Sequence, residues 1–94
     1  MQTFKITHSG INGPWPSTPA YYNFSMTVLQ PRFPRADSVL QKLWIIDTLA
    51  YEIDQNVTGH ITVETPSCMN DNRFSFGLYV FDQEIATIIK LTYS

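Results

Sequence analysis

A cysteine nucleophile is the first chemistry that the residue types allow. Cys68 is the one cysteine of the chain, and a cysteine enzyme needs a base such as His8 or His60 close enough to generate the thiolate. The three residues lie in different segments, so their spacing alone brings none of them together. The sequence therefore predicts no catalytic residue, and a small cysteine-dependent enzyme stays open as an alternative.

Metal binding has less support in the motifs. The chain has no His-x-x-x-His, no Cys-x-x-Cys and no EF-hand loop. Residues 69–72, Met-Asn-Asp-Asn, gather oxygen donors as calcium sites do, but no glutamate follows at the spacing that would complete such a site. The sequence predicts neither a metal site nor a cofactor.

An aromatic strand offers a route to nucleic acid. Residues 74–81, Phe-Ser-Phe-Gly-Leu-Tyr-Val-Phe, match the pattern of the RNA-recognition sheet, whose rings stack on bases, only at Phe76, Gly77 and Phe81. The order of elements differs from that of the family, and a formal net charge of −2 opposes the binding of a polyanion. Nucleic-acid binding through this strand is an alternative rather than the expected function.

A long helix is predicted over residues 37–55. Ser38 and Gln41 fit a capping box, and Asp37 suits the positive N-terminal end of a helix. Asn56 and Gly59 supply the stop signal. The predicted core-facing stripe consists of Val39, Leu43, Ile46, Ala50 and Ile53, widened by Leu49.

A second stripe of the same helix is the main candidate for partner binding. At about 100° per residue, Leu40, Trp44 and Tyr51 fall together, away from the core stripe and flanked by acids. Large rigid side chains inside a polar rim are typical of protein-binding hot spots. Trp15 in the proline-rich loop and Tyr21 beside that loop are two further aromatic candidates. The candidate binding residues are Leu40, Trp44, Asp47, Tyr51, Trp15 and Tyr21; the alternative, that Trp44 and Trp15 complete a small core, stays open.

The other segments are predicted as strands joined by loops. Apolar and polar residues alternate in the predicted strands, which are residues 3–8, 21–29, 59–65 and 73–81. Proline, glycine and other turn residues predict loops over 9–20, 30–35 and 66–72. Asp82 suits a helix start, but residues 82–93 are rich in β-branched side chains, so we expect a strand there. The expected fold is one α+β domain over residues 1–94, an antiparallel sheet of four to five strands in the order β-β-α-β-β-β, packed against one long helix.

Composition and charge narrow the classes of function. A chain of 94 residues with 44% hydrophobic and 15% charged residues is too apolar for a disordered segment. No apolar run approaches the ~20 residues that cross a bilayer, and one cysteine without a signal-like start predicts a cytoplasmic location. All eight acids follow residue 36, so the chain is mildly acidic and its charge is uneven.

These observations favour a non-catalytic protein–protein interaction module, which would act as a stoichiometric inhibitor or modulator of a larger enzyme or complex. In size, acidity and lack of motifs the chain is similar to phage-encoded antagonists of host defence, although it shares no motif with them and no family is identified. We expect a larger protein as the partner, with neither nucleic acid nor membrane bound. Association of identical copies stays open.

Overall fold

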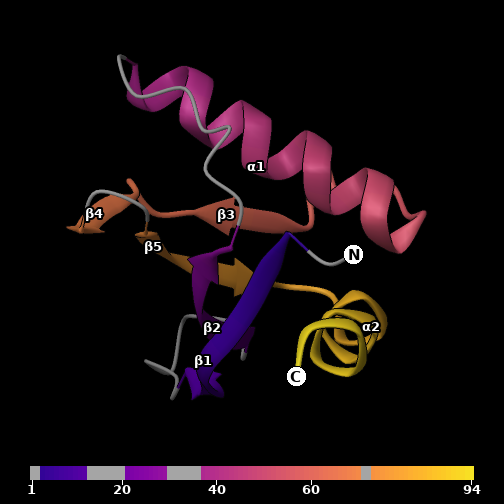
Figure 1. The fold of residues 1–94 in the computed structure, drawn as a ribbon. Coiled ribbons are helices and arrows are strands. Elements are labelled where there is room, and N and C mark those ends of the chain that lie inside the picture. Colours follow the sequence, from indigo (N-terminus) through magenta and orange to yellow (C-terminus); the bar gives the residue numbers. More distant parts are fainter. Residues whose placement is uncertain (1–2, 13–20, 30–36, 71–72) are drawn as a thin grey trace.

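The computed structural model describes residues 3–12, 21–29, 37–70 and 73–94 (Figure 1). Its elements, in order, are β1 (Phe4–Asn12), β2 (Tyr21–Val28), α1 (Ser38–Ile53), β3 (Ile61–Val63), β4 (Ser67–Asn70), β5 (Arg73–Val80) and α2 (Gln83–Tyr93). The strands form an antiparallel sheet in the order β1-β2-β5-β3, and β4 also pairs with β5. The predicted α+β class is confirmed, although the order of the elements differs.

The last segment is a helix, so the strand expected over residues 82–93 is wrong. The Asp82 carboxylate caps α2 by accepting hydrogen bonds from the backbone N–H groups of Glu84 and Ile85, at 2.9 and 3.1 Å. The buried side chains of α2 are Ile85, Ala86, Ile89 and Tyr93. This cap and the burial of one helical face outweigh the strand preference of branched side chains. The sheet consequently packs against two helices rather than one.

Two predicted loops contain strand residues. β1 continues through residues 9–12, which stay paired with β2 beyond a register shift between Ile6 and His8. Residues 67–70, predicted as part of a turn, form β4 beside the start of β5. The hairpin of β1 and β2 is therefore longer than the alternation of residues indicated.

Both helices lie on one face of the sheet, and Phe4 joins them. Its ring makes edge contacts with Trp44 of α1, Tyr93 of α2 and Phe76 of β5, at centroid distances of 5.8, 5.7 and 5.5 Å. In β5 the residues that face the helices are buried, namely Phe74, Phe76, Leu78 and Val80. The intervening residues of β5 point to the opposite face of the sheet.

The face that α1 turns to the core is not the predicted one. The buried residues of α1 are Ile45, Leu49 and Ile53, so Leu49 and Ile53 were correctly placed. Val39 and Leu43, predicted to be buried, are 62% and 50% exposed. Ile46 and Ala50 are partly buried at the edge of the core. The helix is apolar on more than one side, so periodicity indicates two overlapping stripes and does not select between them.

Aspartates begin and end α1. The Asp37 side chain, rather than that of Ser38, caps the helix by accepting a hydrogen bond from the Val39 N–H at 2.8 Å. The helix ends at Asp54, which takes the left-handed conformation with φ 53° and ψ 46°, and its N–H donates to the Ala50 carbonyl. The stop therefore comes before the Asn56–Gly59 segment in which it was predicted.

Glu52 ties α1 to the N-terminal segment and to α2. Its Oε2 accepts hydrogen bonds from the Thr3 N–H at 3.0 Å and from the Thr3 hydroxyl at 2.7 Å. Its Oε1 accepts from the Tyr93 hydroxyl at 2.8 Å. The pKa of Tyr93 is raised well above its usual value near 10. The largest cause is burial of the ring, and smaller contributions come from the hydrogen bond to Glu52 and from the negative charge of Glu52.

This shift predicts a loss of stability in alkali. Below pH ~10 the Tyr93 phenol is protonated in both the folded and the unfolded chain, so its contribution to the free energy of unfolding is fully present. Above pH ~10 only the unfolded chain ionises this tyrosine, and the free energy of unfolding should fall by up to about 1.4 kcal/mol per pH unit from this group. Urea titrations at a series of pH values measure the decline, and Tyr93→Phe should make it shallower. Equal slopes for both proteins would contradict the prediction.

Candidate functional site

The outward side of α1 carries a row of exposed side chains. Val39, Leu43, Asp47 and Tyr51 follow one another at intervals of four, and Leu40 lies beside the first two; these five residues are called the α1 outer face. Leu40 is 53% exposed and Tyr51 is 87% exposed, and Val39 and Leu43 are also exposed. The α1 outer face is thus apolar at four positions, with one carboxylate in the middle of the row.

The predicted binding residues are divided by the structure. Leu40, Asp47 and Tyr51 lie together on the α1 outer face and are exposed. Trp44 is partly buried, and its ring packs on Phe4, so it belongs in part to the core. Tyr21 is the first residue of β2 and pairs with Asn12, whereas Trp15 lies outside the described residues.

The backbone keeps Cys68 apart from both histidines. Cys68 pairs with Phe74 at the start of β5, while the His60 carbonyl accepts a hydrogen bond from the Phe81 N–H just beyond the end of β5. The seven steps of strand between these two points span about 23 Å. His8 lies in β1, which β2 and β5 separate from β4, a distance of about 14 Å across the sheet. These separations do not allow a cysteine–histidine pair.

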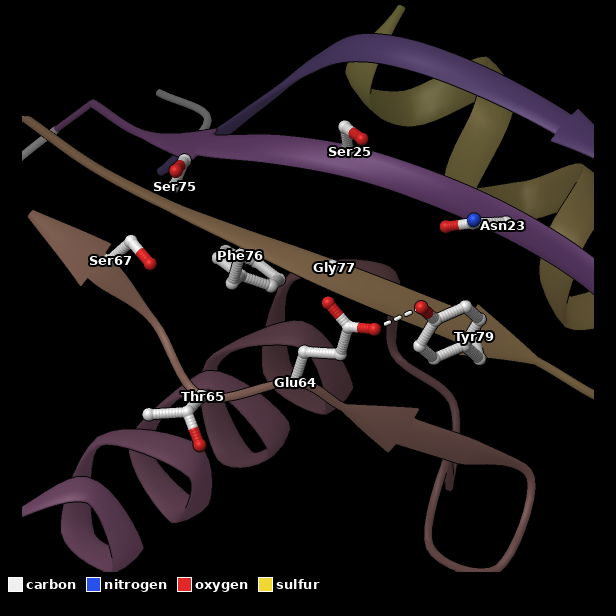
Figure 2. A pocket seen from close by; sticks show the side chains of 9 residues that line it. All are labelled: Asn23, Ser25, Glu64, Thr65, Ser67, Ser75, Phe76, Gly77 and Tyr79. Carbon is white, nitrogen blue, oxygen red and sulfur yellow. Dashed lines mark hydrogen bonds between the residues drawn. The ribbon is translucent and has the colours of Figure 1, made fainter. Parts of the chain in front are cut away.

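The aromatic strand turns two of its four rings inward, and Phe81, just beyond the end of β5, is exposed. Phe74 and Phe76 are buried between β5 and the helices, so in this conformation their rings are not accessible to nucleic-acid bases. Tyr79 projects from β5 toward the opposite face of the sheet (Figure 2). This arrangement counts against base stacking by the strand that resembles the RNA-binding pattern.

A hollow of about 240 Å³ lies on the face of the sheet opposite the helices (Figure 2). Polar side chains from β2, β4, β5 and the β3–β4 connection line it, among them Asn23, Ser25, Glu64, Ser67, Ser75 and Tyr79. Among the lining residues that the structure describes, Glu64 is the only charged one. We call this feature the Glu64 hollow.

Glu64 is held in place by β5. Its backbone N–H donates to the Gly77 carbonyl at 2.9 Å, and its Oε1 accepts a hydrogen bond from the Tyr79 hydroxyl (Figure 2). Its Oε2 lies over Gly77, where the Cβ of any other residue would come within 2.7 Å of that oxygen. Glycine at position 77 therefore makes room for the carboxylate.

A bulge sits next to Glu64. Val63 pairs with Leu78 and Ser67 pairs with Ser75, so four steps along residues 63–67 match three steps along β5. The extra residue falls within 64–66, and Pro66, which has no N–H to donate, suits such a position. Bulges of this kind redirect neighbouring side chains, and here the bulge follows the residue that occupies the hollow.

Sequence reasoning did not find the Glu64 hollow. Glu64 and Tyr79 are far apart in the chain and belong to no motif. The one available signal was Gly77 inside an otherwise aromatic strand, because such a glycine often marks close approach of another group.

Comparison with protein-family models, with curated proteins and with solved structures finds no match. None of the described helices is long and apolar enough to span a membrane. In the described ranges no three His, Cys, Asp or Glu side chains gather in a way that could hold a metal ion. The α1 outer face and the Glu64 hollow are therefore the two candidate sites of the described chain.

Proposed function

We propose that this chain is a non-catalytic protein-binding module that docks a larger protein on the α1 outer face. The observation that carries the proposal is the exposure of four large side chains, those of Val39, Leu40, Leu43 and Tyr51, on one side of a helix. Exposed apolar side chains gathered on one side of a helix are typical of an interaction site, and helices dock into grooves through side chains at this spacing. The separation of Cys68 from both histidines supports a binding role over a catalytic one.

Asp47 indicates what kind of partner fits. It lies in the row between Leu43 and Tyr51, so a partner that covers the row also covers this carboxylate. An antiparallel pair of α1 helices from two copies, centred on the row, would place Asp47 against Leu43 and bury a carboxylate without a cation, which is costly. The α1 outer face has no lysine or arginine to offset that cost. We therefore infer a different protein with an apolar groove and a basic side chain that faces Asp47.

A partner of this kind would be bound one to one. We propose that the chain acts as a stoichiometric inhibitor or modulator of a larger enzyme or complex. In this role α1 would occupy the apolar groove on the partner's surface. The binding energy should come from the apolar side chains, while Asp47 mainly guides association.

Site-specific crosslinking identifies the partner and tests the surface. A photoreactive phenylalanine analogue at position 51 should capture one protein, whereas the same analogue at position 91 of α2 should not. Leu91 is a matched control because it is also exposed, at 77%, but lies on the other helix. Capture of the same protein from both positions would contradict docking on the α1 outer face.

The affinity of the purified partner gives the second test. Leu43→Asp and Tyr51→Ala should each raise the Kd about thirtyfold or more, equivalent to about 2 kcal/mol, as substitutions at hot spots do. Leu91→Asp should leave the Kd within about twofold, as a change outside the interface does. Because Leu43 and Tyr51 are exposed, urea titration should show all three variants folded. A Leu43→Asp variant that binds like the natural sequence would refute the proposal.

A further inference from the structure

We infer that the Glu64 hollow binds the guanidinium group of an arginine side chain on a protein partner. The Glu64 hollow lies on the opposite face of the sheet from α1, so this site is separate from the α1 outer face and goes beyond the proposed function.

The arrangement of oxygen atoms supports a planar cation. Glu64 uses Oε1 to accept from Tyr79, and its Oε2 lies over Gly77 beside the hollow. Ser25 and Ser75 add hydroxyl oxygens from the two neighbouring strands. A guanidinium group presents five N–H donors in one plane and no acceptor, so it matches a carboxylate surrounded by acceptor oxygens.

The carboxylate is positioned before any ligand arrives. The Tyr79 hydroxyl fixes one oxygen, the Gly77 backbone leaves space for the other, and the bulge after Glu64 sets the direction of the chain. A group that is already held in the binding geometry loses little conformational entropy when a ligand binds. The Tyr79 ring also lines the hollow next to the carboxylate, and arginine side chains often pack against aromatic rings.

Size and charge favour an arginine side chain over the other classes of ligand. At about 240 Å³ the Glu64 hollow is smaller than the ~300–1,000 Å³ of pockets for whole small molecules, and it suits the end of one side chain. A divalent cation site usually combines several carboxylate and carbonyl oxygens, and Glu64 is the only carboxylate among the described lining residues. A phosphate or carboxylate ligand would be repelled by Glu64.

Titration of the full chain with a minimal arginine probe tests the site. N-acetyl-arginine amide should shift the backbone NMR signals of Gly77, Tyr79 and Ser25 in a saturable way, at millimolar concentrations. N-acetyl-citrulline amide, which has the same shape without the charge, should bind at least tenfold more weakly. N-acetyl-lysine amide should also bind severalfold more weakly, because its ammonium group is not planar.

Variants assign the effect to Glu64. Glu64→Gln should weaken binding of the arginine probe at least tenfold, whereas Glu84→Gln, which changes an exposed glutamate of α2, should not alter it. Gly77→Ala should also weaken binding, since the added methyl group displaces the Glu64 carboxylate. Leu43→Asp should bind the probe normally, so failure at α1 and failure at the Glu64 hollow can be told apart. Unchanged binding by Glu64→Gln, or equal binding of the citrulline or lysine probe, would overturn the inference.

Discussion

Leu49→Ala is expected to lower the free energy of unfolding by about 3–5 kcal/mol. Leu49 is fully buried in the core cluster beneath α1, so truncation removes apolar contacts and leaves a cavity. Such a loss is a large share of the ~5–15 kcal/mol that stabilises a typical domain. Urea titration followed by circular dichroism measures the change.

Leu43→Ala is the matched control, because it makes the same substitution in the same helix. Leu43 is half exposed, so we expect a loss below about 1 kcal/mol. The ratio of the two losses reports which side of α1 faces the sheet. If both variants lose a similar free energy of unfolding, or Leu43→Ala loses more, then α1 packs on the sheet through a different side from the one that carries Leu49.

Glu52→Ala is expected to lower the free energy of unfolding by about 2–4 kcal/mol. The substitution deprives the Thr3 N–H, the Thr3 hydroxyl and the Tyr93 hydroxyl of their common acceptor. Tyr93 is almost fully buried, so water cannot easily replace the lost hydrogen bond to its hydroxyl. Thermal and urea unfolding measure the loss.

Asp47→Ala provides the comparison for Glu52→Ala. Asp47 is an exposed carboxylate in the same helix, and its removal should change stability by less than about 0.5 kcal/mol. Tyr93→Phe should lie between the two, with a loss of about 1–2 kcal/mol, because it removes only one hydrogen bond of the Glu52 group. If Glu52→Ala is no more destabilising than Asp47→Ala, the hydrogen bonds of Glu52 do not stabilise the fold.

The alternation of residues was enough to predict most of the strands. In residues 73–81 every second side chain is apolar, and those side chains are the ones that β5 buries against the helices. Local signals of this kind work because side chains in a strand point to alternate faces whatever lies around them. Cap residues and helical periodicity placed α1 within a residue or two of its observed bounds.

Residues 82–93 show where local signals conflict. The Asp82 cap indicated a helix and the branched isoleucines indicated a strand, and each preference is small. Burial of Ile85, Ile89 and Tyr93 against the core decided for the helix. That gain depends on contacts with β1, β2 and β5, which the segment itself does not contain.

The α+β class, the positions of α1 and of most strands, and the surplus of apolar side chains on α1 are predictable from the residues alone, because they follow from the periods of helix and strand and from local caps. The buried side of α1 depends on tertiary contacts, since Ile45 and Leu43 are equally apolar and differ in what lies opposite them. Tertiary contacts also bring Glu64 over Gly77 and beside Tyr79. Antiparallel pairing and its registers join residues distant in the chain, and no local preference encodes those contacts.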